Sequence, residues 1–265
     1  MPSADPPPRL AQALALGLLQ GPAELLPISS SAHTALLPWL AGWRGWAELP
    51  AEARKDFEVA LHGGAGLALA LRLGRELIGG DARTMAPAVG LPAVVGLALE
   101  GPIERRLGGP RSIAVGLLAG AVAMVAADRR GGERRDAREA HVGDGVALGL
   151  AQVAALAPGL SRNGATLAVA RARGFSRAAA QTLSWRVGLP VILGPVLLRA
   201  HGVRRRDLAG MGPALAVGAG GAFVSSWAAA GLLRRARFRA IPLWPYALYR
   251  CALAALLTVR LRRSK

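Results

Sequence analysis

Long stretches without any charged residue limit what this chain can fold into. Residues 208–233 contain no Asp, Glu, Lys or Arg. Shorter uncharged runs occupy 25–43, 84–99, 112–127 and 145–161. A transmembrane helix needs about 20 predominantly apolar residues, and these runs approach or exceed that length. They predict a polytopic membrane protein that crosses the bilayer several times.

The charged residues separate these apolar runs and do not gather in one patch. The 33 basic and 16 acidic residues give a net charge of +17, which by itself would allow a nucleic-acid-binding protein. Their placement between apolar runs is typical of loops that connect membrane helices, so we expect no nucleic-acid partner. A hydrophobic content of 52% excludes a disordered chain, and the single cysteine, Cys251, excludes a disulfide-bonded scaffold.

The apolar pattern predicts six spanning helices and two broken segments. The spans are expected at 57–78, 84–104, 111–127, 176–200, 208–233 and 241–260. In 10–42 and 144–173, a short apolar helix is followed by a proline break, polar residues and a second short helix. Such backbone is tolerated at membrane depth only where it is buried in protein or lines a wet cavity. We therefore expect an all-α integral membrane bundle with two re-entrant helix–loop–helix hairpins.

The two broken segments also resemble each other when the chain is shifted by 132 positions. The shift places ALGLLQ at 15–20 on ALGLAQ at 147–152, and Ser29 on Ser161. Chance similarity between segments rich in Ala and Leu is the alternative, but it explains the matching polar residues less well. Duplications in membrane proteins are often inverted, with broken helices that meet at the functional site.

This inverted repeat gives a division of the chain within one membrane domain. We expect a disordered leader, a first repeat that includes the hairpin 10–42, a charged loop, and a second repeat that includes the hairpin 144–173. In that order the segments are 1–9, 10–127, 128–141 and 142–265.

The broken segments hold most of the polar residues that we expect at membrane depth, where an ionisable group is a candidate functional residue. Arg162 can donate two parallel hydrogen bonds to phosphate, and Gly164 allows the backbone to approach an anion. Glu24 can bind a divalent cation or act as a base. Ser30 and His33 are suited to act as nucleophile and base. The set predicts phosphoryl transfer on a lipid-borne phosphate.

Each of these residues also has a purely structural interpretation. Ser31 could cap the helix that follows the break, and His33 could bond a neighbouring helix. Glu24 could pair with Arg162, and Thr166 could bond back to its own helix. Two residues near the start of the 57–78 span could be ordinary interfacial residues, namely Glu58 and His62.

Four segments resemble the undecaprenyl-pyrophosphate phosphatase family of the bacitracin-resistance type. In chain order they are QGPAELLPISSSAH (20–33), FEVALHGGAGLAL (57–69), PGLSRNGAT (158–166) and IPLWPYALYR (241–250). The resemblance covers nearly the whole chain, and the Pro-Gly-x-Ser-Arg motif with its threonine is its most specific part. It implies a membrane bundle with two re-entrant hairpins in an inverted repeat, which agrees with the duplication.

The resemblance implies a role for each matching residue. Gln20 and Glu24 match the family's Glu/Gln-x-x-x-Glu motif and imply a divalent cation, Mg²⁺ or Ca²⁺. Ser30 matches the proposed nucleophile, His33 the nearby catalytic histidine, and Arg162 the arginine that holds the pyrophosphate. Further residues expected to bind the phosphate groups are Ser29, Ser161, Asn163, Gly164 and Thr166.

Three positions depart from the family pattern. Gln20 stands where many members have Glu, so one metal-binding charge is missing. Asn163 replaces the usual Ser, and Ala32 replaces the usual Gly. The first departure bears on the strength of metal binding more than on activity.

The resemblance implies a multi-pass enzyme of the bacterial plasma membrane. It would hydrolyse undecaprenyl pyrophosphate to undecaprenyl phosphate and phosphate, recycle the lipid carrier for cell-wall synthesis and give bacitracin resistance. Attack by Ser30, with His33 or Glu24 as the base, and direct attack by water both remain open. The partners expected are the substrate and the bilayer, and the oligomeric state is open, with a homodimer as one option.

A transporter is the alternative from another class. Inverted repeats with broken helices are common in transporters, so the same site could serve a polyprenyl-phosphate flippase. A flippase needs Arg162 to hold phosphate but has no need of the Ser30–His33 pair. A third interpretation, an inactive scaffold, rests on Gln20 alone. In any of these we expect the two loops to approach each other, because Glu24 or Arg162 alone in the membrane would be costly to bury.

Overall fold

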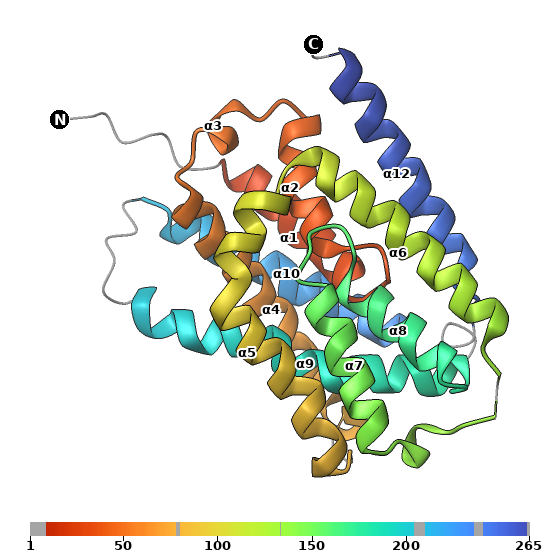
Figure 1. The fold of residues 1–265 in the computed structure, drawn as a ribbon. Coiled ribbons are helices and arrows are strands. Elements are labelled where there is room, and N and C mark those ends of the chain that lie inside the picture. Colours follow the sequence, from red (N-terminus) through yellow and green to blue (C-terminus); the bar gives the residue numbers. More distant parts are fainter. Residues whose placement is uncertain (1–8, 78–79, 133, 204–209, 236–240, 264–265) are drawn as a thin grey trace. The chain divides into compact units, whose positions relative to one another are not determined.

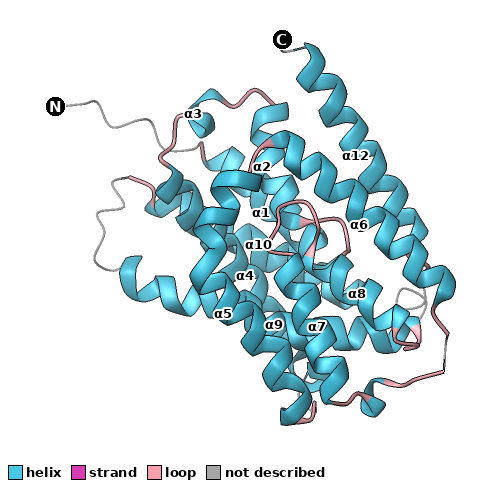
Figure 2. Cartoon of the chain, in the orientation of Figure 1, coloured by secondary structure: helices cyan, strands magenta, loops and turns pink. Residues whose placement is uncertain are grey.

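The computed structural model describes residues 9–77, 80–132, 134–203, 210–235 and 241–263 (Figure 1). Within these residues the chain forms helices and loops and contains no strand, apart from an isolated bridge between Arg135 and Phe175 (Figure 2). The predicted all-α fold is therefore confirmed. Residues 1–8 of the expected leader lie outside the described part.

Each expected span overlaps one long helix. These are α4 (Ala51–Leu77), α5 (Ala82–Leu107), α6 (Pro110–Arg130), α9 (Arg177–Val203), α10 (Gly212–Leu233) and α12 (Trp244–Arg263). Shorter helices form the two broken segments, α1 (Leu10–Leu25) with α2 (Ser30–Leu40), and α7 (Val142–Ala154) with α8 (Arg162–Ala172). The connections contain α3 (Arg44–Ala47) and the 3₁₀ turn η1 (Ala137–Glu139). Because α6 continues through Arg130, the first three residues of the expected loop 128–141 are helical.

Four of the described helices are long and apolar enough to cross a membrane. The qualifying stretches are Ala82–Leu99, Pro110–Arg130, Arg177–Arg199 and Gly212–Leu233. Helices α4 and α12 carry more charge, yet they expose large apolar side chains, among them Leu67, Leu71, Leu248 and Leu256. Exposed apolar surface of this kind is stable against lipid and unfavourable in water. The chain is a multi-pass membrane protein, and re-entry of the two broken segments stays a prediction.

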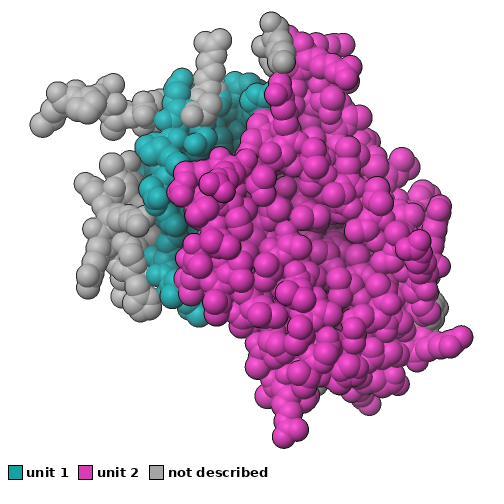
Figure 3. All heavy atoms as spheres, in the orientation of Figure 1, with its two compact units in different colours: residues 1–25, 33–74, 192–232 teal, residues 26–32, 75–191, 233–265 magenta. Residues whose placement is uncertain are grey.

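The chain packs as two compact units, which are described separately below (Figure 3). Unit 1 consists of Met1–Leu25, His33–Gly74 and Ile192–Leu232. Unit 2 consists of Leu26–Ala32, Arg75–Val191 and Leu233–Lys265. These are packing units, so the boundaries of the sequence repeat stay a prediction.

In unit 1, helix α1 lies directly against the backbone of α10. A Cβ added at Gly17 would lie 3.0 Å from the amide nitrogen of Ala222 and closer still to the carbonyl oxygen of Gly218. A Cβ at Gly21 would lie 2.5 Å from the Ser225 hydroxyl. Only glycine permits backbones to approach so closely, which is a common way of packing helices in lipid. The contact fixes the part of α1 that carries Gln20.

In unit 2, helix α12 packs along α6, α5 packs along α7, and α8 contacts both α6 and α7 (Figure 1).

A buried glutamine of this unit bonds a backbone carbonyl of α5 that has no partner within its own helix. Pro92 has no N–H with which to bond the carbonyl of Ala88 one turn earlier. The Nε2 atom of Gln152 in α7 donates to that carbonyl at 2.8 Å. Gln152, which the repeat pairs with Gln20, therefore joins α7 to α5.

Candidate functional site

The carboxylate of Glu24 lies in the interior of unit 1, one helical turn from Gln20. Glu24 is 6% exposed and Gln20 is fully buried. The Nε2 atom of Gln20 donates to Glu24 Oε2 at 3.2 Å. The Oε1 atom of Gln20 is buried and has no hydrogen-bond partner among the described residues. The Gln20 amide thus lies beside the Glu24 carboxylate with its nitrogen toward it, and its oxygen keeps free lone pairs.

His62 of α4 also contacts Glu24, although the sequence left it open as an interfacial residue. Its Nε2 atom lies 3.5 Å from Glu24 Oε2, and its Nδ1 atom lies 2.8 Å from the carbonyl oxygen of Glu58. Because a carbonyl only accepts hydrogen bonds, Nδ1 carries a hydrogen. Nε2 is the ring nitrogen that faces the Glu24 carboxylate, and the contact between them is favourable when Nε2 is protonated too. The signal in the sequence was an ionisable residue within an apolar stretch.

A serine from α10 bridges the backbone of α1 beside these residues. The Gly21 amide donates to Ser225 Oγ at 3.1 Å, and Ser225 Oγ lies 2.9 Å from the Gly17 carbonyl, to which it donates. The hydroxyl thus inserts between two groups of the helix ladder. The next residue, Pro22, lacks an N–H altogether. The turn that carries Gln20 is therefore shaped by α10, which the sequence did not indicate.

In unit 2, the two serines that precede α2 and α8 share an unusual backbone conformation. Ser29 has φ 74° and Ser161 has φ 65°, and both lie in the left-handed region that non-glycine residues rarely adopt. Such conformations cost about 1–3 kcal/mol and are concentrated at functional sites. The two residues are the pair that the 132-residue shift superimposes. The two residues therefore share a conformation as well as a position in the sequence alignment, and the repeat itself stays a prediction.

The Arg250 guanidinium of α12 holds both loops. It is fully buried, and its Nη1 donates to the carbonyl of Pro27 at 3.3 Å. Its Nη2 donates to the carbonyls of Gly159 at 2.7 Å and Leu160 at 3.1 Å. Further bonds reach α6, from Nη2 to Gly116 and from Nε to Leu117. One cation therefore brings together the loops that precede α2 and α8.

Sequence reasoning assigned no role to Arg250. A fixed cation within an expected span was the signal that could have identified it, because such a residue is costly in a membrane unless it has partners. The structure supplies those partners as backbone carbonyls, and their number is visible only once the loops are folded.

The polar residues of α8 are bonded to their own helix and to α9. Ser161 Oγ accepts a hydrogen bond from the Gly164 amide at 3.1 Å and thereby caps α8. Thr166 Oγ1 lies 2.9 Å from the Arg162 carbonyl, as the structural interpretation expected. Ser184 Oγ donates to Asn163 Oδ1 and also contacts Thr166 Oγ1, each at 2.6 Å. Ser184, another residue that the sequence did not indicate, fixes this part of α8 on α9.

The remaining candidates lie on α2 and at the start of α8. Ser30 is partly exposed and His33 is buried, and their spacing of three residues places them on neighbouring positions of one helix face. Arg162 is partly exposed, with a buried Nη1 atom. Glu24 and His33 belong to unit 1, and Ser30 and Arg162 to unit 2. A joint site of all four therefore stays a prediction.

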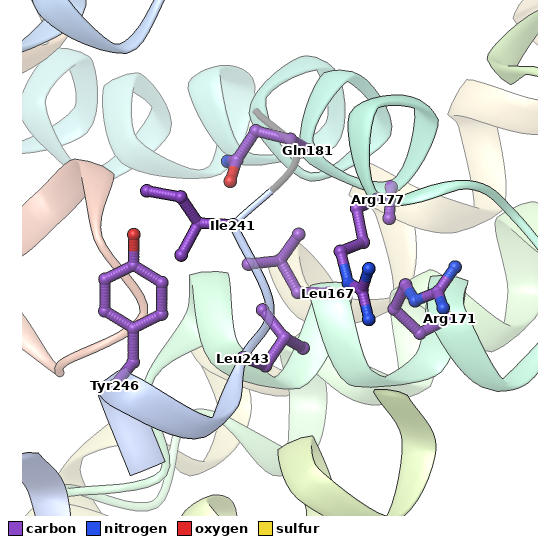
Figure 4. A pocket seen from close by; sticks show the side chains of 8 residues that line it. Leu167, Arg171, Arg177, Gln181, Ile241, Leu243 and Tyr246 are labelled. Atoms are coloured by element: carbon purple, nitrogen blue, oxygen red, sulfur yellow. The ribbon is translucent and has the colours of Figure 1, made fainter. Parts of the chain in front are cut away.

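Unit 2 contains a pocket whose lining includes none of these candidates. Its lining includes Leu167, Arg171, Arg177, Gln181 and Tyr246 (Figure 4). Both arginines donate hydrogen bonds to the carboxylate of Asp128. None of the predicted site residues lines this pocket, so the predicted chemistry does not belong there.

Arg250→Lys should destabilise the protein, because an ammonium group cannot reach carbonyls on three segments at once. Each buried carbonyl left without a donor costs about 1–3 kcal/mol. We expect the thermal midpoint of the purified protein in detergent to fall by about 5 °C or more. Arg260→Lys, at an exposed position of the same helix, is the control and should melt like the wild type. An unchanged midpoint for Arg250→Lys would contradict the structural role.

Comparison with known proteins identifies the family. The bacitracin resistance protein BacA family matches residues 13–256. The chain is 35% identical to an undecaprenyl-diphosphatase of Geobacter metallireducens, across 90% of this chain and 93% of that protein. It is 37% identical to one of Desulforudis audaxviator (71% and 75%) and 35% identical to one of Pelobacter propionicus (91% and 93%). The chain therefore belongs to the bacitracin resistance protein BacA family.

Proposed function

We propose that this protein is an undecaprenyl-diphosphatase, a membrane hydrolase that converts undecaprenyl pyrophosphate to undecaprenyl phosphate and phosphate. The observation that carries this assignment is the match to relatives of that name over nine-tenths of the chain. The product is the lipid carrier in the form that cell-wall synthesis reuses, and its recycling gives bacitracin resistance. The flippase alternative is not favoured, because the relatives are named as phosphatases.

Arg162 binds the pyrophosphate in this proposal. Its planar guanidinium can donate two parallel hydrogen bonds to phosphate oxygens and neutralise charge that develops on them. Arg162 is the first residue of α8, directly after the cap Ser161, and helix N-termini favour anions. The Gly164 amide already donates to Ser161 Oγ and completes the helix cap. In this proposal the phosphate is therefore held by the Arg162 guanidinium and not by that amide.

Ser30 is the proposed nucleophile. Its Oγ forms a bond to the terminal phosphorus, the bond from that phosphorus to the bridging oxygen breaks, and undecaprenyl phosphate leaves. His33 or Glu24 takes the hydroxyl proton, and water then hydrolyses the phosphoserine. Direct attack by water on the terminal phosphorus is the competing mechanism. The placement of Ser30 and His33 one turn apart on α2 supports the first.

The donor set near Glu24 fits a divalent cation that arrives with the substrate. The part of the chain that the structure describes contains no group of three or more His, Cys, Asp or Glu suited to hold a metal. It does contain the Glu24 carboxylate beside the Gln20 amide, whose Oε1 has no hydrogen-bond partner among the described residues. Mg²⁺ is commonly bound by one or two protein oxygens together with substrate phosphates. When bound, Mg²⁺ or Ca²⁺ would neutralise charge on the phosphate oxygens.

The oligomeric state is a separate part of the proposal. A homodimer stays a prediction, and light scattering of the purified protein in detergent would measure it.

Ser30→Ala should abolish phosphate release from undecaprenyl pyrophosphate, by about 10³-fold or more if Ser30 is the nucleophile. Substrate binding should persist, because the change removes no charge. Phosphate release and lipid binding by the purified protein in detergent are the measurements. Ser31→Ala, at the exposed neighbouring position, is the control and should act within a few-fold of the wild type. Full hydrolysis by Ser30→Ala would exclude the covalent mechanism and leave direct attack by water.

Arg162→Lys should retain the fold but lose most of the activity. Lysine keeps the charge but loses the planar fork. We expect a decrease in kcat/KM of about 10²-fold, comparable to the loss of one group that stabilises the transition state. Arg263→Lys, in the exposed last turn of α12, is the matched control. Wild-type turnover by Arg162→Lys would show that Arg162 does not bind the reacting phosphate.

Gln20→Glu should strengthen the dependence on a divalent cation. The variant places a second carboxylate beside Glu24, and hard cations prefer charged oxygen ligands. We expect half-maximal activity at a metal concentration roughly tenfold lower, and a chelator should inhibit both the wild type and the variant. Gln12→Glu makes the same chemical change two turns earlier on α1 and should leave the metal dependence unchanged. Full activity in the presence of chelator would refute the metal proposal.

A further inference from the structure

Gly188 of α9 leaves the space in which the Arg162 guanidinium lies. A Cβ built on Gly188 would be 2.6 Å from Arg162 Cζ, 3.2 Å from Nη2 and closer still to Nη1. Real Cβ atoms essentially never approach another heavy atom to within 3.0 Å. Any side chain at position 188 would therefore occupy the same space as the guanidinium. Both residues belong to unit 2, so their relative position is part of one packed body.

The register of α9 against α8 cannot change easily to relieve such an overlap. Ser184 lies one turn before Gly188 on α9 and is fully buried. It is held at 2.6 Å from both Asn163 Oδ1 and Thr166 Oγ1 of α8. A shift of α9 would break these buried hydrogen bonds, which is costly in an apolar interior. The guanidinium is therefore the group that must move.

The atoms nearest to Gly188 differ from those nearest to two helix-packing glycines of the same unit, Gly145 and Gly149. A Cβ at Gly145 would meet the backbone of Thr84, and one at Gly149 would meet the backbone carbonyl of Pro87. The three nearest atoms to a Cβ at Gly188 all belong to the end of one flexible side chain. Helix packing can thus absorb a methyl group at Gly188 if Arg162 swings away. We therefore expect the fold to accommodate a methyl group at position 188 and the Arg162 guanidinium to be displaced by it.

We propose that Gly188 is a positioning residue, which acts through Arg162 by leaving room for its guanidinium against α9. The proposal rests on the proposed function, in which Arg162 holds the pyrophosphate. A bidentate contact depends on the direction of the guanidinium plane as well as on its charge. A displacement of about 1 Å at a reacting centre can cost about 10²-fold in rate. Gly188 therefore sets where the phosphate is held.

The first test compares two alanine substitutions on α9. A Cβ at Gly194 would meet nothing within 4 Å, so Gly194→Ala is a matched control on the same helix. Both variants should unfold in detergent within a few degrees of the wild type, since Ala favours a helix more than Gly does. We expect Gly188→Ala to lose about 10²-fold in kcat/KM, whereas Gly194→Ala stays within about twofold. Wild-type kinetics for Gly188→Ala would overturn the proposal.

A double-mutant cycle separates positioning from a general structural role. In an Arg162→Ala background, Gly188→Ala should cause no further loss beyond about twofold, because the guanidinium that it displaces is absent. The same further loss as in the wild type would overturn the proposal. If Gly188→Ala alone does not fold, the double variant should fold, because the overlap has been removed. A double variant that also fails to fold would count against the inference.

Binding of inorganic pyrophosphate, measured by calorimetry, distinguishes this inference from the proposed function. Gly188→Ala should weaken that binding about as much as Arg162→Ala does, while Gly194→Ala binds like the wild type. If the wild type binds inorganic pyrophosphate but does not hydrolyse the lipid, the proposed function fails and the positioning role still stands. Unchanged binding in Gly188→Ala, with an active wild type, refutes the positioning role alone.

Discussion

The buried guanidinium of Arg250 is the interaction on which the candidate site most depends. A cation taken out of water costs several kcal/mol unless polar groups surround it. A loop at the end of a helix has carbonyl acceptors that lack helical donors, whereas a buried cation has donors that need acceptors. Arg250 meets both requirements at once, since it bonds carbonyls of α6, of the loop before α2 and of the loop before α8. The left-handed residues Ser29 and Ser161 belong to these two loops, so the cation helps to maintain their strained backbone.

The need to pair buried donors with buried acceptors also explains the polar side chains that lie elsewhere between the helices. In a membrane, a backbone group without a partner cannot bond to water. The chain breaks its helices with prolines and supplies side chains at the breaks. Gln152 bonds the carbonyl that Pro92 leaves open in α5, and Ser225 bridges the α1 backbone beside Pro22. The breaks free the backbone near the site to adopt shapes that a regular helix excludes.

The proposed catalysis uses two kinds of group, a cation that binds phosphate and oxygen ligands for a divalent ion. In the proposal, Arg162 is the directional cation, and its guanidinium lies in the space that the missing side chain of Gly188 leaves. In the proposal, Glu24 and the free oxygen of Gln20 would be ligands for a divalent ion, and His62 lies against the same carboxylate. In phosphoryl transfer, positioning and charge stabilisation account for most of the rate. Residues that fix the place of these groups, as we propose for Gly188, are therefore expected to affect the rate without touching the substrate.

The sequence by itself determined the membrane class, the helices and the residues whose side chains are suited to catalysis or binding. Uncharged runs and proline breaks are local properties, so they predicted α1 with α2 and α7 with α8, and they identified Glu24 and Arg162 as unusual. Only the tertiary structure revealed the contact of His62 with Glu24, the hydrogen bonds from Arg250 to the loops, and the space at Gly188 that the Arg162 guanidinium occupies. These features join residues that are tens to more than two hundred positions apart in the chain. They depend on which helix faces meet, and the packing of side chains decides that, not any local pattern.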